Sequence, residues 1–275
     1  MSSLITPGEL AEALAGPRPP VVLDVRWPIP GPPDRAGYRS GHIPGARFVD
    51  LDTELSAPAG GARGGGHPLP SARVFTAAMR AHGVRKSRPV VVHDLDSGLA
   101  AGRAWWCLRY FGHRDVRVLD GGFAGWRAAK FPVAKGEPDP VEPGNFLAAA
   151  GALPVLDADG AATLAKKGLL LDARSAARYR GEDPADLVRG HIAGAVSAPT
   201  VENVDAAGNW LPAKELTQRF RGLGVRRKPV GVYCGSGVTA CHTILAMDTA
   251  GLPTPALYVG SWSEWSAQER PASTD

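Results

Sequence analysis

Short apolar runs rich in Val, Leu and Ile alternate along the chain with segments whose apolar residues recur at helical spacing. The runs are too short for buried helices, and β-branched residues favour strands. The predicted strands are residues 21–25, 89–93, 116–119, 169–173, 229–233 and 256–259, and the clearest helical patterns cover 102–111 and 238–250. Strands that alternate with helices predict an α/β fold with mostly parallel sheets flanked by helices.

Four blocks of sequence occur twice, in the same order. The pairs are Val21-Val-Leu-Asp-Val-Arg26 with Leu169-Leu-Leu-Asp-Ala-Arg174, Gly41-His-Ile-Pro-Gly-Ala46 with Gly190-His-Ile-Ala-Gly-Ala195, Pro89-Val-Val-Val-His-Asp94 with Pro229-Val-Gly-Val-Tyr-Cys234, and Gly121-Gly-Phe-Ala-Gly-Trp126 with Gly260-Ser-Trp-Ser-Glu-Trp265. This order predicts two tandem copies of one domain. Residues 131–151 are rich in Pro and Gly and show neither period, so we place the boundary near residue 143 and expect domains over 1–143 and 144–275.

Composition narrows the classes of protein to consider. The 275 residues are 44% hydrophobic and 21% charged, values typical of folded globular proteins. No run approaches the roughly 18 apolar residues of a membrane-spanning helix, and the first ten residues show neither a signal-peptide nor a transit-peptide pattern. We therefore expect a cytoplasmic protein with no membrane partner. The net charge is only +4 and the arginines are scattered, so no nucleic-acid partner is expected.

The three cysteines are Cys107, Cys234 and Cys241. They form neither a Cys-x-x-Cys pair nor a spaced Cys/His quartet, which argues against a disulfide framework and a structural zinc site. A phosphate-binding GxxxxGK[ST] loop is also absent. The sequence therefore predicts no metal, nucleotide or flavin cofactor.

Cys234 follows a predicted strand and precedes a glycine-bearing loop and a helix that is expected to begin near Thr239. Ligands of open α/β sheets bind beyond the carboxyl ends of the strands. Gly235 and Gly237 allow a tight turn whose N–H groups point at the sulfur, and the helix N-terminus adds its positive dipole end. Such surroundings favour a thiolate, or a persulfide anion, over a small buried hydrophobic residue. Cys107 and Cys241 are expected to be packing residues.

These motifs resemble those of tandem-domain sulfurtransferases of the rhodanese family. The residues that carry the resemblance are Cys234-Gly-Ser-Gly-Val-Thr239, the paired Gly-His-Ile-x-Gly-Ala blocks and the terminal Gly260-Ser-Trp-Ser-Glu-Trp265. The resemblance covers nearly the whole chain and implies two rhodanese-like domains, of which only the C-terminal one carries the catalytic cysteine. Asp94 aligns with Cys234, so we expect the N-terminal copy to be catalytically silent.

The loop also bears on the sulfur donor. A Cys-Gly-Ser-Gly-Val-Thr loop is similar to that of 3-mercaptopyruvate sulfurtransferases, whereas thiosulfate-preferring members of the family usually carry basic residues after the cysteine. Thiosulfate is a compact dianion that benefits from such cations, while mercaptopyruvate offers a carboxylate and a ketone to arginine and hydroxyl groups. Gly235 and Ser236 carry no charge, so we expect mercaptopyruvate as the donor. Thiosulfate:cyanide sulfur transfer is the alternative.

The resemblance implies attack by Cys234 on the donor's sulfur, release of pyruvate and a persulfide. A thiol such as thioredoxin or glutathione, or cyanide, would then accept that sulfur. Ser236 is expected to hydrogen-bond the donor or relay a proton, with capping of the next helix as the alternative. The loop residues expected to bind the sulfur and the donor are Gly235, Gly237, Val238 and Thr239.

Further site residues follow from the same resemblance. Arg178 matches the family arginine that binds the substrate carboxylate. The family's second such arginine falls at Leu187, and Arg189 is the nearby residue that would have to replace it. Asp52 and His67 match positions that face the cleft in mercaptopyruvate enzymes. Asp52 would join a Cys–Ser–Asp relay and His67 would hydrogen-bond the keto acid, the alternatives being a surface carboxylate and a loop histidine.

Two other functions use similar parts. A cysteine-dependent phosphatase needs an arginine six residues after the cysteine to bind the phosphoryl group, and that position is Ala240. A non-catalytic binding module would be expected to lack the cysteine, which Cys234 and its glycines contradict. Arg26 and Arg174 recur in both copies although only one has the cysteine, so we expect them to brace their own domains.

Overall fold

The structure is a computed structural model that describes residues 2–28, 31–184, 186–226 and 229–275. Contacts between Cα atoms divide the chain into two compact units. Unit 1 consists of Met1–Ala57, Leu69–Ala152 and Ala206–Trp210, and unit 2 consists of Pro58–Pro68, Leu153–Asp205 and Leu211–Asp275. The sequence analysis places a boundary near residue 143. In the structure, residues 144–152 pack on unit 1, because the N–H of Phe146 donates to the carbonyl of Val84 at 3.2 Å.

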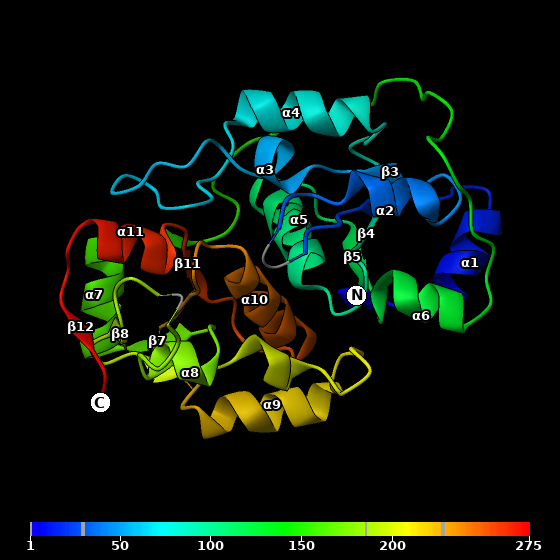
Figure 1. Cartoon of the computed structure of the whole chain (residues 1–275). Coiled ribbons are helices and arrows are strands. Elements are labelled where there is room, and N and C mark those ends of the chain that lie inside the picture. Colours follow the sequence, from blue (N-terminus) through cyan, green and yellow to red (C-terminus); the bar gives the residue numbers. More distant parts are fainter. Residues whose placement is uncertain (1, 29–30, 185, 227–228) are drawn as a thin grey trace. The chain divides into compact units, whose positions relative to one another are not determined.

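Unit 1 contains a five-stranded parallel sheet ordered β1-β5-β4-β2-β3. Its strands are β1 (Leu4–Ile5), β2 (Val21–Asp24), β3 (Arg47–Phe48), β4 (Val90–His93) and β5 (Val116–Leu119). Its helices are α1 (Pro7–Ala15), α2 (Arg35–Ser40), α3 (Leu51–Glu54), α4 (Ala72–Ala81), α5 (Leu99–Tyr110) and α6 (Gly122–Ala128) (Figure 1). The central strand β4 ends directly before Asp94.

Unit 2 repeats this design with the parallel order β6-β11-β10-β7-β9. Its strands are β6 (Val155–Leu156), β7 (Leu169–Asp172), β9 (Val196–Ser197), β10 (Val230–Tyr233) and β11 (Ala256–Tyr258), and β8 (His191–Ile192) pairs antiparallel with β12 (Ala272–Ser273). Its helices are α7 (Ala158–Lys167), α8 (Ala176–Tyr179), the 3-10 helix η1 (Thr200–Asn203), α9 (Ala213–Gly222), α10 (Thr239–Thr249) and α11 (Ser261–Ala267). The central strand β10 ends directly before Cys234, so the repeat predicted from the sequence is confirmed.

The six predicted strands agree with β2, β4, β5, β7, β10 and β11 to within one residue at each end. Helix α10 also agrees to within one residue, whereas α5 begins three residues before the predicted position 102. The earlier start has a local cause: Gly98 adopts a left-handed φ of 81° and its carbonyl accepts the N–H of Gly102 at 2.8 Å. The first turn of a helix that begins after a glycine shows little apolar periodicity, so the sequence pattern predicts the start of this helix too far along the chain.

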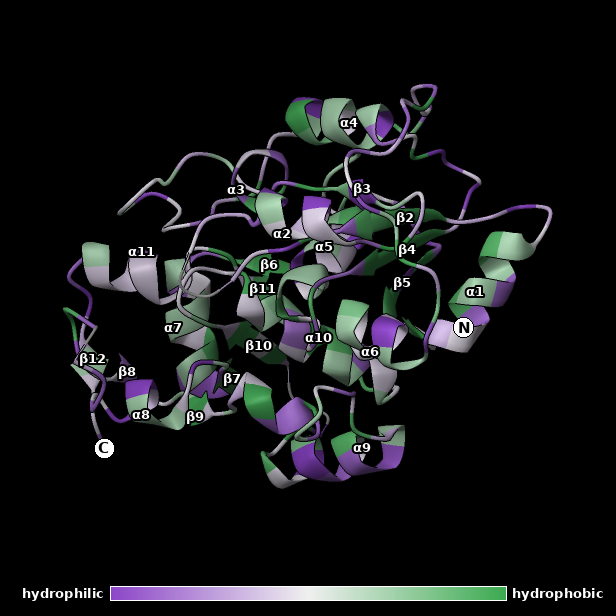
Figure 2. Cartoon of the chain, turned by 45° about the vertical axis from the view of Figure 1, so that its right-hand side comes forward, coloured by the Kyte–Doolittle hydropathy of each residue, from purple (hydrophilic) through white to green (hydrophobic). Residues whose placement is uncertain are grey.

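The central strands of both sheets are buried along their whole length. Parallel strands covered by helices on both faces read as continuous apolar runs, which explains why these strands were predicted so closely (Figure 2). Each core includes a tryptophan from the last helix of its unit, whose indole binds the chain just after that helix. The indole N–H of Trp126 donates to the carbonyl of Pro132 at 2.7 Å, and that of Trp265 donates to Pro271 at 3.0 Å.

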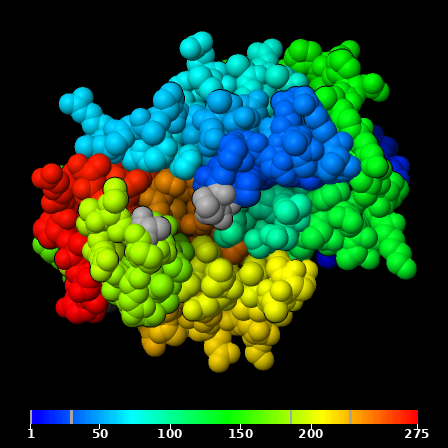
Figure 3. Space-filling view, viewed as in Figure 1, coloured from blue at the N-terminus to red at the C-terminus, as the bar shows by residue number. Residues whose placement is uncertain are grey.

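One segment of each half of the chain belongs by its contacts to the other half's unit. Pro58–Pro68 packs on α11 of unit 2, where Figure 3 shows it in light blue against red. Ala206–Trp210 belongs to unit 1, where the N–H of Trp210 donates to the Asp120 carboxylate at 3.0 Å. Neither segment lies in a repeated block, so the sequence comparison does not predict the exchange. Among the helices of the described residues, none is long and apolar enough to span a membrane.

Candidate active site

The candidate nucleophile Cys234 lies between β10 and α10, as the sequence predicts. Its side chain is 1% exposed, and its Sγ accepts the N–H of Gly237 at 3.2 Å. Gly237 has a φ of 81°, and a Cβ there would lie 2.3 Å from the carbonyl oxygen of Val259. Only glycine fits this turn without strain, so Gly237 is what lets the backbone N–H face the sulfur.

The first turn of α11 fixes the backbone of this loop. The N–H of Trp262 donates to the carbonyl of Cys234 at 3.0 Å, and the N–H of Ser263 donates to that of Gly235 at 2.8 Å. The hydroxyl of Ser261 accepts the N–H of Cys234 at 3.1 Å. Ser261 itself has a φ of 54°, an uncommon conformation for a residue with a Cβ. The loop is therefore held rigidly before any ligand binds.

Ser236 and His67 meet within unit 2. The Oγ of Ser236 lies 2.8 Å from Nδ1 of His67, a hydrogen bond whose donor depends on the histidine tautomer. Helix α10 is capped at Val238 with no side-chain hydrogen bond, so Ser236 does not act as the helix cap. Among the two alternatives in the sequence analysis, the geometry favours a hydroxyl that takes part in a polar pair beside the cysteine.

His67 reaches this position because Pro58–Pro68 is tied to α11. The N–H of Gly64 donates to the Glu264 carboxylate at 2.7 Å, and the N–H of Gly66 donates to the hydroxyl of Ser263 at 2.9 Å. A Cβ on Gly65 would lie 2.3 Å from the carbonyl oxygen of Gly260. This close approach of two backbones makes glycine necessary at position 65.

Arg178, on α8, lies beside the same loop. Its Nη1 is 3.3 Å from the place that a Cβ on Gly235 would occupy. Its Nε donates to Oδ2 of Asp186 at 2.8 Å, and its Nη2 donates to Oδ1 of the same carboxylate. The bonds to Asp186 raise the pKa of Arg178 above its ordinary value, so the guanidinium is a permanent cation next to the cysteine loop.

Arg174 braces its own domain, as its recurrence predicts. Its Nη2 donates to Asp172 at 2.6 Å and to the carbonyl of Gly190 at 2.7 Å. Arg26 makes the matching pair of bonds in unit 1, to Asp24 and Gly41. Each arginine is buried and is held by the aspartate of its own sheet and by a loop carbonyl, which supports the predicted bracing role.

The remaining predicted residues lie as follows. Val238 is the N-cap of α10 and Thr239 is its first residue, so both border the Cys234 loop. Asp52 lies on α3 of unit 1, where its N–H donates to the side chain of Asp50 at 3.0 Å. Arg189 is exposed in unit 2, and Leu187 is fully exposed. Unit 2 thus brings Cys234, Ser236, His67 and Arg178 together, and it does not bring Arg189 to the loop through any recorded bond of the described residues.

Unit 1 preserves the scaffold of this loop without the sulfur. The N–H of Phe123 donates to the carbonyl of Asp94 at 2.9 Å, and the N–H of Ala124 donates to that of Leu95 at 2.8 Å. These bonds correspond to those that Trp262 and Ser263 make in unit 2. The same backbone frame therefore holds a carboxylate in one copy and a thiol in the other.

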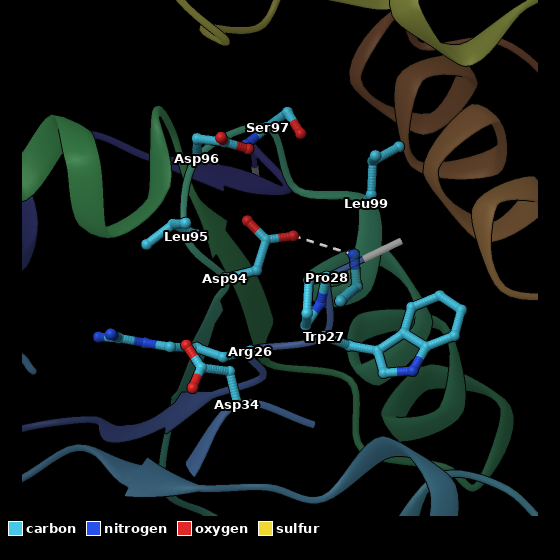
Figure 4. Close-up of a pocket in the computed structure, with 10 residues that line it drawn as sticks. Arg26, Trp27, Pro28, Asp34, Asp94, Leu95, Asp96, Ser97 and Leu99 are labelled. Atoms are coloured by element: carbon cyan, nitrogen blue, oxygen red, sulfur yellow. Dashed lines mark hydrogen bonds between the residues drawn. The ribbon is translucent and has the colours of Figure 1, made fainter. Parts of the chain in front are cut away.

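The Asp94 carboxylate occupies the turn that leads into α5. It accepts the N–H groups of Gly98 and Ala100 at 2.9 Å and that of Ala101 at 3.2 Å. Burial raises the pKa of Asp94, and these N–H groups oppose the rise. Figure 4 shows Asp94 at a cavity of about 300 Å³, with Asp96 and Ser97 on one side and Arg26 and Asp34 on the other.

Sequence reasoning missed two residues of the unit 2 site. The role of Ser261 was not predicted, because no sequence pattern indicates that a serine adopts a left-handed conformation. Asp186 was hidden because it lies eight residues from Arg178 in an irregular segment. A signal was available, since the stretch between α8 and His191 is longer than its counterpart in the first half of the chain.

The sequence of the whole chain is similar to those of known proteins. The rhodanese-like domain matches twice, over residues 6–129 and 157–268. The chain belongs to the rhodanese family. The two matches coincide with the two copies of the α/β domain, so the protein is a tandem rhodanese.

Curated relatives and solved structures refine this assignment. A Pseudomonas aeruginosa protein that carries the name of a 3-mercaptopyruvate sulfurtransferase is 44% identical over 99% of this chain and 98% of its own. The 3-mercaptopyruvate sulfurtransferase of Escherichia coli is 38% identical over 90% of this chain and 89% of its own. The crystal structure of SseA from Escherichia coli, described as a 3-mercaptopyruvate sulfotransferase, matches with a TM-score of 0.83 and 36% identity, and covers 95% of this chain and 99% of that one.

A thiosulfate sulfurtransferase name also occurs among the relatives. SseB of Mycobacterium tuberculosis carries it, and is 40% identical over 96% of this chain and 94% of its own. All of these relatives are named as sulfurtransferases. This rhodanese is therefore an enzyme of the sulfurtransferase type, close to the 3-mercaptopyruvate sulfurtransferases, that takes sulfur from a donor and passes it to an acceptor.

Proposed function

We propose that this rhodanese transfers sulfur from 3-mercaptopyruvate to a thiol or to cyanide through a persulfide on Cys234, and releases pyruvate. The observation that carries the proposal is the geometry of the loop. The sulfur of Cys234 accepts a backbone N–H at the start of the eleven-residue helix α10, and Arg178 lies beside the next residue. A thiolate, a persulfide anion and a donor carboxylate are all anions that such a setting stabilises.

The first half-reaction balances without a cofactor. The thiolate of Cys234 attacks the donor's thiol sulfur, an S–S bond forms, and the C–S bond breaks. The leaving group is the enolate of pyruvate. Its methylene carbon takes up the proton that the donor thiol gave up, which yields pyruvate. In the second half-reaction an acceptor thiolate, such as that of glutathione or thioredoxin, or cyanide, attacks the outer sulfur and releases the thiolate of Cys234.

We assign the supporting roles by position. Arg178 binds the donor carboxylate, because its Nη1 faces the loop at Gly235. Ser236, paired with His67, carries the proton between the donor thiol and the enolate carbon. The N–H groups of the loop from Gly235 to Thr239 receive the outer sulfur. For Asp52 and Arg189 the predicted roles rest on the sequence alone.

Thiosulfate is the second candidate donor, and the name of the Mycobacterium tuberculosis relative favours it. The uncharged Gly235 and Ser236 argue for mercaptopyruvate, because a compact dianion would benefit from a cation in the loop. Arg178 also has only one free edge, which suits a carboxylate bound at the end of the guanidinium.

The proposal is tested by steady-state kinetics with mercaptopyruvate and with thiosulfate as donors to cyanide. We expect a higher kcat/KM with mercaptopyruvate, and loss of turnover with both donors in Cys234→Ser. Cys107→Ala, which alters a buried cysteine of unit 1, is the matched control and should retain turnover. Mass spectrometry after donor treatment should find one added sulfur atom on the Cys234 peptide. A higher kcat/KM with thiosulfate would reverse the donor assignment, and no added sulfur with either donor would refute persulfide transfer.

A further inference from the structure

The internal repeat offers a comparison between a copy with the cysteine and a copy without it. In unit 1, Tyr38 stacks on His42, and its backbone carbonyl is hydrogen-bonded to Nδ1 of that histidine. Tyr179 and His191 make the same two contacts in unit 2. The first pair is four positions apart in sequence, whereas the second is twelve positions apart. Unit 2 therefore contains extra residues after α8 that the shared fold does not require.

Two charged residues separate the copies at this place. The residue before the shared tyrosine is Arg178 in unit 2 and Gly37 in unit 1. A Cβ on Gly37 would lie 1.9 Å from the Asp34 carboxylate, so a side chain there would displace the group that caps α2. Asp186 lies within the extra residues of unit 2. The arginine and its carboxylate partner thus occur only in the copy that carries the cysteine.

Asp186 connects a fixed arginine with a half-buried one. Its side chain is 7% exposed, and one of its oxygens lies 3.6 Å from Nη1 of Arg174. That Nη1 is buried and has no hydrogen-bond partner among the described residues, while the rest of Arg174 is held by Asp172 and stacks 4.4 Å over Trp262. The same oxygen, Oδ2, accepts the Nε of Arg178, so the carboxylate of Asp186 lies between the two guanidinium groups and is attracted by both.

Asp186 fixes the orientation of Arg178 through both of its carboxylate oxygens. The carboxylate occupies the edge formed by Nε and Nη2, which leaves Nη1 directed at Gly235. The Arg178 side chain is 34% exposed, so without this clamp it would sample many rotamers. A cation that is oriented before the donor arrives loses less entropy when the donor binds.

We propose that Asp186 is a positioning residue, which holds Arg178 so that Nη1 receives the carboxylate of the sulfur donor next to Cys234. The inference rests on the proposed function, since it assigns the donor's carboxylate to Arg178. The order of contacts is Asp172, Arg174, Asp186 and Arg178, and it transmits the rigidity of β7 to the edge of the cysteine loop. Unit 1 lacks the last two members and lacks the cysteine.

The first test uses alkylation of Cys234 and needs no sulfur transfer. Iodoacetate carries a carboxylate and iodoacetamide does not, so the ratio of their rates at Cys234 reports recruitment of a carboxylate. We expect Asp186→Asn to lower this ratio roughly 5- to 20-fold, because an arginine that loses its clamp forms weaker charge-assisted bonds. Iodoacetamide offers no carboxylate to Arg178, so its rate reports the thiolate and the intact loop and serves as the denominator of the ratio.

Four further variants make the test specific. Arg178→Gln should lower the ratio at least as much, and the double variant Asp186→Asn/Arg178→Gln should be no lower than Arg178→Gln, since Asp186 acts through Arg178. Glu182→Gln removes an equal charge from the same segment, where the carboxylate pairs with exposed Arg180, and should leave the ratio unchanged. Asp186→Glu retains the charge and should restore part of the ratio. A ratio that stays the same or rises in Asp186→Asn would overturn the inference.

Steady-state kinetics with mercaptopyruvate separate this inference from the proposed function. Asp186→Asn should raise KM by a factor similar to the loss in the alkylation ratio and leave kcat within about twofold, because binding and not chemistry is affected. If the wild type transfers sulfur from mercaptopyruvate and KM is unchanged in the variant, the positioning role is wrong and the function stands. If the wild type does not use mercaptopyruvate, the function is wrong and the alkylation ratio still decides the role of Asp186.

Discussion

Asp94 follows β4 in unit 1 as Cys234 follows β10 in unit 2, and both side chains accept backbone N–H groups from the turn into the next helix. The Asp94 carboxylate accepts three of these N–H groups, and the sulfur of Cys234 accepts the N–H of Gly237. The turn of unit 1 thus holds an anion of its own, the Asp94 carboxylate, where unit 2 carries the thiol.

The Asp94 carboxylate should be necessary for the stability of unit 1. In Asp94→Asn, one oxygen is replaced by an NH2 group that must face the N–H of Gly98 or those of Ala100 and Ala101. We expect the free energy of unfolding to fall by about 1–3 kcal/mol. Urea denaturation measures this, with Asp96→Asn, an exposed position of the same loop, as the control. Equal stability of the two variants would show that the three bonds contribute little.

His113 should make the stability of unit 1 depend on pH. Burial lowers the pKa of His113 below 6.5, and Nε2 lies 3.2 Å from the carbonyl of Arg85. The unfolded chain binds a proton at this residue more tightly than the folded chain, so stability is fully present above pH 6.5 and is lost as the pH falls towards the lowered folded-state value. His113→Gln should remove part of the loss of stability seen between pH 7.5 and 5.5. If the free energy of unfolding falls by the same amount in both proteins between pH 7.5 and 5.5, the prediction is wrong.

Ser236 should contribute to turnover more than to folding. Its Oγ pairs with Nδ1 of His67 and does not cap α10. We expect Ser236→Ala to lower kcat for sulfur transfer about 10- to 100-fold through loss of proton transfer, with little change in the melting temperature. Ser40→Ala removes an exposed hydroxyl of α2 in unit 1 and is the control. A normal kcat in Ser236→Ala would exclude the hydroxyl from the reaction.

At the scale of elements, the site is the connection between β10 and α10, held by α11. The turn depends on Gly237, whose missing Cβ leaves room for the carbonyl of Val259 and whose N–H contacts the sulfur. The strand, the turn and the helix must keep their register for that N–H to reach Sγ. The element is thus a single functional part whose geometry is fixed by one backbone conformation.

Gly237→Ala should disrupt this connection. A Cβ 2.3 Å from a backbone oxygen at a φ of 81° forces the turn to move. We expect a loss of about 1–3 kcal/mol in the free energy of unfolding, together with a clear fall in the rate of persulfide formation in stopped-flow or mass-spectrometric time courses. Gly222→Ala at the end of α9, where a Cβ meets nothing within 4 Å, is the control. Unchanged persulfide formation in Gly237→Ala would mean that its N–H is dispensable.

At the scale of the whole molecule, the tandem rhodanese combines two copies that have diverged in side chains and not in topology. Both sheets keep the same strand order, and both loops keep equivalent bonds to the first turn of α6 or α11. Two segments, Pro58–Pro68 and Ala206–Trp210, lie outside the repeated blocks and belong to the unit of the other half of the chain. Pro58–Pro68 gives unit 2 its His67, so the copy that carries Cys234 contains a residue encoded in the first half of the chain.

The segment Pro58–Pro68 should detach from α11 in Gly65→Ala. Its Cβ would lie 2.3 Å from the carbonyl of Gly260 and 2.6 Å from the hydroxyl of Ser263. We expect faster amide hydrogen exchange in peptides covering this segment, since Gly64 and Gly66 lose their partners, and a lower kcat through displacement of His67. Gly61→Ala has a similarly left-handed φ but open space, so it separates backbone strain from collision. Equal exchange in the two variants would place the effect in strain alone.

Most of the fold could be predicted because the central strands are buried on both faces and therefore read as continuous apolar runs. The repeated blocks around Asp94 and Cys234 then gave the two domains. The start of α5 was less predictable, since Gly98 opens it and a bound carboxylate, not an apolar period, stabilises its first turn. For the site, Cys234 and Arg178 were accessible from motifs, whereas Ser261 was not, because its role depends on a φ that no sequence pattern records.

The sequence by itself determined the α/β fold, the duplication, the cysteine-bearing loop and the sulfurtransferase family, because these depend on local periodicity and on short motifs. Only the tertiary structure decided that Pro58–Pro68 belongs to unit 2, that His67 meets Ser236, and that Asp186 clamps Arg178. These contacts join residues far apart in the chain or lie in segments without a period. Their geometry follows from how whole elements pack, which spacing along the chain does not record.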